Sequence, residues 1–187
     1  MPQPADQYTD KIWITFKTRI YAEKRLQNYA FWSHLLMTYY AIFLIAAQFL
    51  ISPDQTPDLL TKLNIFLSIV VLIFSLLIYG FRFEERAAKH RDCYLRLQRL
   101  LDAGYTPKKT LDLYHEVIDG YPNHIDQDYN NFLVETILLY GQDVVSRGNK
   151  LKAGGYRVLI YVITRMRNMG ILLTLFASPA VVLKFAI

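Results

Sequence analysis

The stretch that decides the fold is LNIFLSIVVLIFSLLIYGF, residues 63–81, which carries no formal charge over 19 residues. Fourteen of these residues are Leu, Ile, Val or Phe. A bilayer core needs about 20 apolar residues in helical form, at ~1.5 Å rise per residue. Each such side chain favours insertion by roughly 0.3–0.6 kcal/mol at mid-helix. We expect residues 63–81 to span a membrane rather than to form a buried helix of a soluble bundle, because few polar residues mark any face.

A second apolar stretch precedes it. FWSHLLMTYYAIFLIAAQFLI, residues 31–51, is the densest part of 28 uncharged residues between Arg25 and Asp54, with His34 counted as neutral. It begins too far from the N-terminus for a signal peptide and lacks a small-residue cleavage site. The link SPDQTPDLLT, residues 52–61, is long enough for a helical hairpin and little more. The two stretches therefore predict a two-span hairpin.

Basic residues predict how the hairpin is oriented. Only Lys62 lies near the link, whereas basic residues gather on both outer flanks. Those flanking residues are Lys11, Lys17, Arg19, Lys24, Arg25, Arg82, Arg86, Lys89, Arg91, Arg96 and Arg99. Because Lys and Arg stay on the cytoplasmic side, both outer ends are expected in the cytosol and the link outside.

Helical periodicity continues on both flanks. Before the first span one face holds Trp13, Phe16 and Ile20; after the second span one face holds Ala87, His90, Tyr94, Leu97 and Leu101. Neither Gly nor Pro interrupts the chain between Gly80 and Gly104, so we expect one helix from Leu63 to about Asp102. The two extensions are expected to pair as an antiparallel stalk.

Three further segments complete the chain. Thr106 and Pro107 predict the start of a helix that Gly120 and Pro122 end. Asp126 is a plausible cap for the next helix. That helix is expected to bury Tyr129, Phe132, Leu133, Ile137, Tyr140 and Val144. Residues 146–155 read as a basic loop, and no alternating pattern predicts a sheet.

The tail, residues 156–187, is apolar but punctuated by Arg157, Arg165, Arg167 and Lys184. Its longest uncharged run, residues 168–183, has 16 residues with Pro179 inside, which is short for a span. We expect an interfacial or oligomerising helix, and a third span is the alternative.

The predicted fold is therefore all-α, without a sheet. A cytosolic helix, residues 1–30, leads into a transmembrane hairpin, residues 31–81, with spans at 31–51 and 63–81. A cytosolic helical region, residues 82–155, and the apolar helix, residues 156–187, follow.

Polar side chains form weak stripes on the two spans. The candidates are His34, Thr38, Gln48, Asn64, Ser68 and Ser75. They either line a pore or hydrogen-bond between helices, and both readings stay open. A pore lined in this way would carry no charge ring and so would select weakly among ions.

Basic side chains outside the spans also allow two readings. They contact lipid headgroups, or they contact a nucleic-acid or nucleotide partner, and charge alone does not separate these. The candidates are Arg19, Arg25, Arg82, Arg86, Arg96, Arg99, Lys108 and Lys109.

Enzymatic chemistry is not indicated. His115-Glu116 lacks the second His of a zinc-protease helix, because Asp119 stands four places on. His124, Asp126 and Asp128 fit a capped turn better than a metal site. No glycine-rich phosphate loop occurs, and the single Cys93 excludes a disulfide framework. We expect no enzyme, no cofactor and no metal.

Three segments together resemble the SLATT family of SMODS- and SLOG-associating two-transmembrane effectors. They are KTRIYAEKRLQ before the first span, ERAAKHRDCYLRLQRLL after the second, and YHEVIDGYPNHIDQDYNNF, which looks like the reverse-transcriptase-linked subfamily. The resemblance covers about Lys11 to Val145. In the basic segment before the first span, the residues that match the family are Arg19, Arg25 and Leu26. In the helix that leaves the membrane after the second span, they are Arg86, His90, Tyr94, Leu97 and Leu101.

The resemblance implies a function. It implies an oligomeric pore-forming or membrane-disrupting effector of a bacterial antiviral system that acts by abortive infection in the inner membrane. The implied trigger is a nucleotide second-messenger system or a reverse transcriptase with its RNA. The alternative is a membrane-anchored module that recruits a reverse transcriptase–RNA complex and leaves the membrane intact. Two spans cannot enclose a channel, so any pore requires several copies.

Overall fold

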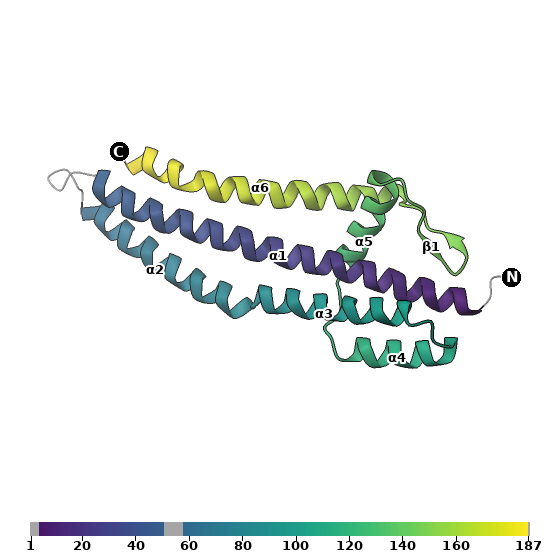
Figure 1. Cartoon of the computed structure of the whole chain (residues 1–187). Helices are drawn as coiled ribbons and strands as arrows, with labels where there is room; N and C mark the ends of the chain where they lie inside the picture. The colour runs from purple at the N-terminus through teal and green to yellow at the C-terminus, as the bar shows by residue number, and fades with distance from the viewer. Residues whose placement is uncertain (1–3, 51–57, 187) are drawn as a thin grey trace. The chain divides into compact units, whose positions relative to one another are not determined.

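The computed structural model describes residues 4–50 and 58–186, and the side chains of residues 8–47, 61–62 and 64–181 (Figure 1). Nearly all of these residues are helical. The helices are α1 (Pro4–Leu50), α2 (Asp58–Phe81), α3 (Phe83–Asp102), α4 (Pro107–Asp119), α5 (Asp126–Val134), the π-helix η2 (Glu135–Leu139) and α6 (Gly155–Ala186). The chain is therefore all-α in class, as its sequence predicts.

One small hairpin departs from that prediction. Strands β1 (Val145–Ser146) and β2 (Asn149–Lys150) pair antiparallel within the expected basic loop. The two residues between them, Arg147 and Gly148, both have positive φ, 52° and 75°. That pair of angles is typical of the tight turn that suits a right-twisted hairpin. Strands of two residues are too short to show alternation, so no sequence pattern predicts them.

The chain forms two compact units. The first, here called the core unit, holds the residues up to Gln27 and Glu84–Arg165. The second, the apolar unit, holds Asn28–Phe83 and the residues from Met166 onward. The division passes through α1 and α6, so each of these helices supplies one part to each unit.

Helix α1 runs for 47 residues without a break. It continues from the amphipathic segment around Trp13 into the apolar stretch that begins at Phe31, as the absence of Gly and Pro predicts. A helix of this length rises about 70 Å.

Helices α2 and α3 correct the prediction of one continuous helix from Leu63 to Asp102. The helix is interrupted at Arg82, which has φ of 50°. Its N–H donates to the carbonyl of Tyr79 at 3.3 Å, which closes a tight turn. The Phe81 and Phe83 rings meet across this point at 5.4 Å. A left-handed residue that is neither Gly nor Asn is uncommon, so the sequence did not indicate the break.

In the core unit α1, α3 and α4 share one hydrophobic cluster. Its buried members are Ile12, Cys93, Leu97, Leu100 and Tyr114. Phe16 packs at its edge and meets the ring of Tyr94 at 5.8 Å, in the T-shaped geometry that aromatic pairs favour. The α1 and α3 extensions therefore do contact each other, and Figure 1 shows α4 along the outer side of α3.

The buried face of α3 is rotated from the predicted one. Ala87, His90 and Leu97 are buried as expected. Cys93 and Leu100 are buried too, whereas their neighbours Tyr94 and Leu101 are only half-buried. The 3-4-3-4 pattern predicts a single buried strip on α3. Because α4 packs against α3 as well, a second strip of α3 is buried.

A second cluster lies between α1 and α5. Phe132, Leu133 and Val144 are its buried members, and the rings of Trp13 and Tyr21 meet that of Phe132 at 5.7 and 6.0 Å. The predicted burial of Tyr140 on this helix is wrong, because its side chain is 64% exposed. The π-helix inserts an extra residue per turn there and turns Tyr140 outward.

The starts of α4 and α5 are set locally. Thr106 is the N-cap of α4, with Pro107 as the first helical residue, as predicted. For α5 the N-cap is Ile125 and not Asp126. The carboxylate that accepts the Ile125 N–H, at 3.1 Å, is that of Asp128, three residues further on. The prediction of Asp126 as cap is therefore wrong.

Candidate functional site: apolar helices and a buried charged cluster

Among the described residues, three helical stretches are long and apolar enough to cross a membrane. They are Tyr8–Ala47, Asn64–Asp102 and Gly155–Val181, with mean hydropathy of 1.5, 2.4 and 1.4 in their most apolar windows. Only 11%, 0% and 0% of the residues in these windows are buried within the chain. Apolar surface on this scale needs lipid or other protein to cover it. The chain is accordingly a membrane protein, and the tail joins the two predicted spans as a candidate.

The apolar unit brings the polar stripe to its surface. His34, Thr38, Ser68 and Ser75 are exposed, and Asn64 is half-buried. The side chain of Gln48 lies outside the described residues. The Thr38 hydroxyl donates to the His34 carbonyl at 2.9 Å, and the Ser68 hydroxyl donates to the Asn64 carbonyl at 2.8 Å. Hydroxyls that bond within their own helix can face lipid as well as water. Both readings of the stripe therefore remain predictions.

Two of the basic residues proposed to contact headgroups or partners have another role. Arg19 is 1% exposed, and its Nη1 donates to the carbonyl of Pro122. Arg25 forms a two-pronged ion pair with Asp128, from Nε to Oδ1 at 2.7 Å and from Nη2 to Oδ2 at 3.1 Å. Arg19 is buried, and Arg25, half-buried, is held by Asp128, so both are corrected from surface contacts to packing groups of the core unit.

The charged cluster consists of Arg19, Arg25, His90, His124 and Asp128. It draws together α1, α3, α5 and the α4–α5 loop within the core unit. The Asp128 side chain is 0% exposed, and the Arg25 side chain is 14% exposed. Asp128 thus performs two tasks at once, because one carboxylate caps α5 and holds α1. Charged groups this deep are stable only when they are paired and hydrogen-bonded.

The two histidines of the cluster are held neutral. Burial, together with the positive charge of Arg19, lowers the pKa of His90 to about 4. Burial and Arg19 also lower the pKa of His124. Asp128 opposes both shifts, and Arg25 adds to that of His90. Among the described residues Arg19 Nε, His90 Nδ1 and His124 Nδ1 have no hydrogen-bond partner, so the cluster is incompletely satisfied.

The remaining basic candidates stay at the surface. Arg82, Arg86, Arg96, Arg99, Lys108 and Lys109 are all exposed. Lys109 lies over the Tyr105 ring, with its Nζ 4.2 Å from the ring centroid. Contact of these six with headgroups or with a partner therefore stays a prediction.

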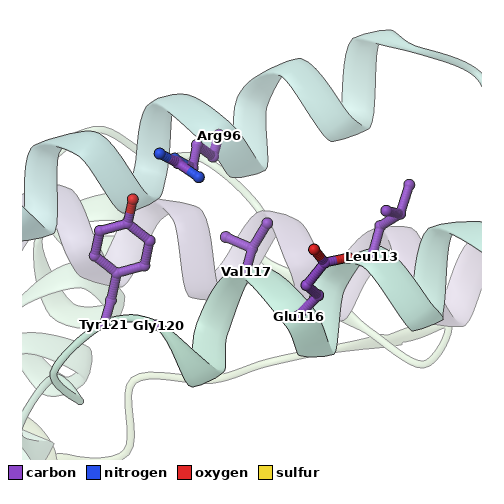
Figure 2. A pocket seen from close by; sticks show the side chains of 6 residues that line it. All are labelled: Arg96, Leu113, Glu116, Val117, Gly120 and Tyr121. Atoms are coloured by element: carbon purple, nitrogen blue, oxygen red, sulfur yellow. The ribbon is translucent and has the colours of Figure 1, made fainter.

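A groove of about 390 Å³ lies between α3 and α4 (Figure 2). Arg96 lines it from α3, and Glu116 and Tyr121 line it from the α4 side. Arg96 is paired with Asp92, Nε to Oδ2 at 3.2 Å, and Tyr121 also donates to that carboxylate, which lowers the pKa of Asp92. The positive charge in the groove is thus balanced, and no anion site is formed.

Sequence reasoning missed the cluster because its members look ordinary one at a time. Arg25 and Asp128 are 103 residues apart, as are Arg19 and Pro122. The available signal was the short polar turn from Pro122 to Asp128, which holds His124 and two aspartates between two amphipathic helices.

Residues 1–185 match the family model described as SMODS and SLOG-associating 2TM effector domain family 5. No curated protein and no solved structure matches the chain.

Proposed function

Since this chain belongs to family 5 of the SMODS and SLOG-associating two-transmembrane effector domains, we propose that it permeabilises a membrane as an oligomer. The membrane is the bacterial inner membrane, and the context is an antiviral system that stops growth of the infected cell. Family membership and the apolar helices support a membrane-associated effector domain, and permeabilisation is the proposed activity of that domain. The α1 N-terminus and the core unit are assigned to the cytosol because basic residues flank the apolar helices there.

The observation that carries the proposal is that the chain itself buries almost no residue of its three most apolar helical windows. Large side chains on α2, such as Phe66, Leu72 and Leu76, are 61%, 60% and 65% exposed. Lipid can cover such a surface, and so can equivalent helices of further copies. A single copy has too few helices to enclose a channel, so permeabilisation requires a ring of copies, each adding polar groups such as Asn64 and Ser75.

The charged cluster supplies a route from trigger to membrane. Arg19 and Arg25 lie on the part of α1 that continues without a break into the apolar unit at Asn28. Their partners, the Pro122 carbonyl and Asp128, lie in the α4–α5 loop and in α5. A partner that displaces this loop would release two arginines of α1 at once. A packed network with two arrangements is the kind of element through which binding changes a distant segment.

The proposed trigger is a nucleotide-signalling protein or a reverse transcriptase with its RNA. The exposed basic residues Arg96, Arg99, Lys108 and Lys109 support a contact with such a partner. Direct contact with nucleic acid has weaker support, because Arg96 is already paired with Asp92.

Liposome leakage tests the proposal. The purified chain is reconstituted into vesicles filled with a self-quenching dye. The proposed trigger, a nucleotide-signalling protein or a reverse transcriptase with its RNA, is then added. We expect dye release that rises more steeply than linearly with the protein-to-lipid ratio, together with an oligomer in detergent. The matched control is Tyr79→Phe, which alters an exposed α2 side chain without adding charge.

The contrary result is a folded, triggered oligomer in intact vesicles. Partner binding that is abolished by neutralising Arg96, Arg99, Lys108 and Lys109, with no leakage in any state, would instead identify a membrane-anchored recruiting module. The two outcomes are therefore separated by one set of samples.

A further inference from the structure

The tail helix makes specific contacts with the first apolar stretch. Within the apolar unit, the α6 ring of Phe176 meets Tyr39 at 5.2 Å and Trp32 at 6.4 Å. The Tyr39 hydroxyl donates to the Phe176 carbonyl at 3.0 Å. The Tyr40 hydroxyl donates to the Leu175 carbonyl at 2.9 Å. These contacts distinguish α6 from a helix that merely lies on a surface.

One of the two carbonyls that the tyrosines reach, that of Leu175, is left without its helical partner by Pro179. Proline has no N–H, so residue 179 cannot donate to the carbonyl of Leu175, four residues earlier. Tyr40 supplies one donor to that oxygen, and the Ser178 hydroxyl supplies a second at 2.9 Å. Tyr40 and Ser178 also lie 2.6 Å apart, oxygen to oxygen. In water such a carbonyl would be hydrated; in lipid it must be satisfied by protein.

The tyrosine hydroxyls and the α6 carbonyls satisfy each other. Two tyrosine hydroxyls in the middle of an apolar helix also need partners when water is absent. Tyr39 and Tyr40 lie next to the centre of residues 31–51, and Leu175 and Phe176 lie at the centre of the uncharged run 168–183. The contact therefore joins two segments midpoint to midpoint, as expected for two helices that cross the same apolar layer.

Length and charge fit the same placement. Sixteen residues rise about 24 Å, a few Å less than the ~30 Å hydrocarbon core. Arg165 and Arg167, both exposed, stand just before the run, and their long side chains can extend to the headgroups. The boundary between the two units falls at this point, after Arg165.

The direction of α6 follows from the point at which each helix enters the apolar unit. Helix α1 enters the apolar unit at Asn28 and α6 enters it at Met166, and Figure 1 shows the two helices running in the same direction there. We propose that α6 from Met166 onward is a third membrane span, parallel to the first and fastened to it at mid-membrane by Tyr39 and Tyr40 through the carbonyls of Phe176 and Leu175, the second of which Pro179 frees. The C-terminus then lies on the outer side; the assignment of that side rests on the proposed cytosolic start of α1.

Cysteine labelling in intact cells tests the topology. In a Cys93→Ser background, single cysteines are introduced by Lys108→Cys, by Gln55→Cys and as an addition after Ile187. A membrane-impermeant maleimide is then applied. The third span predicts that the C-terminal cysteine and Gln55→Cys react, whereas Lys108→Cys reacts only after the cells are opened.

Two contrary outcomes are distinct. A C-terminal cysteine that is protected like Lys108→Cys overturns the third span alone. Equal labelling of Gln55→Cys and Lys108→Cys overturns the hairpin itself, and with it both this inference and the proposed function. Leakage plays no part in the readout, so a failed permeabilisation assay leaves the topology test unaffected.

A double-mutant cycle tests the fastening. Tyr40→Phe should lower the melting temperature in lipid bicelles, because Leu175 loses a donor. In a Pro179→Ala background the new N–H can bond to Leu175, so the same change should lower the melting temperature by less. Tyr79→Phe serves as the control, since Tyr79 is 85% exposed. Equal losses from Tyr40→Phe in the two backgrounds would refute the fastening.

Discussion

Removing one partner of the Arg25–Asp128 pair should destabilise the core unit strongly. Arg25→Met leaves Asp128 without its cation at 0% side-chain exposure. Breaking a buried ion pair from one side costs about 3–5 kcal/mol. The lower end applies here, because Asp128 keeps the Ile125 N–H as a donor and Arg25 itself is 14% exposed. We therefore expect a loss of ~3 kcal/mol, which for a chain of this length corresponds to a fall in melting temperature of roughly 6–12 °C.

The assay is thermal unfolding of the detergent-solubilised chain, followed by circular dichroism near neutral pH. The double variant Arg25→Met with Asp128→Asn removes both charges but keeps an acceptor for the α5 cap. It should melt well above the value expected from adding the two single losses. Arg96→Met, which breaks an exposed pair, is the matched control and should change the melting temperature little. Strict additivity, or a control loss as large as that of Arg25→Met, would refute the reasoning.

Three further predictions use the same preparations. Because the pKa of His90 is about 4 in the folded chain and near 6.5 when unfolded, the unfolded chain binds the proton more readily, so stability should fall as the pH falls from 6.5 toward 4. His90→Gln should flatten this dependence in melting curves, and the exposed His115→Gln should not. Cys93 is 0% exposed, and burial raises the pKa of its thiol. Its reaction with a disulfide reagent should therefore be slower in the folded chain than in denaturant, by a factor on the order of 10³ or more. Arg82→Gly should be tolerated at φ of 50°, and Arg82→Val should be less stable than Arg82→Gly by about 1–2 kcal/mol in thermal unfolding; equal stabilities of the two variants would contradict a left-handed turn there.

Local signals made most of the fold predictable. The apolar stretches at 31–51 and 63–81 reveal themselves because each run is long enough by itself to match the thickness of a bilayer. Likewise, Pro107 indicates the start of α4, because its fixed φ and missing N–H suit the first helical position; Thr106 occupies the N-cap position but its side chain makes no capping hydrogen bond. Features of this kind need no information from elsewhere in the chain.

Features that depend on distant contacts could not be predicted in the same way. The buried face of α3 was displaced because a third helix, α4, packs on it, and periodicity gives one face without saying how many neighbours cover it. At Arg82 the chain adopts a left-handed conformation that its residue type does not favour. Glycine would have indicated that turn, but Gly80 lies two residues earlier, inside α2.

Arg19 and Arg25 contribute to the predicted orientation of the hairpin during insertion and to the packing of the core unit after folding. They were counted among the basic residues that orient the hairpin, and that rule acts on the chain as it inserts, when side chains far apart in sequence have not yet met. The folded core unit then buries both, one on the Pro122 carbonyl and one on Asp128. Burial therefore removes them as headgroup contacts without removing them from the orientation argument. The proposed cytosolic placement of α1 uses their charge during insertion, and the proposed coupling of α1 to the α4–α5 loop uses their partners afterwards.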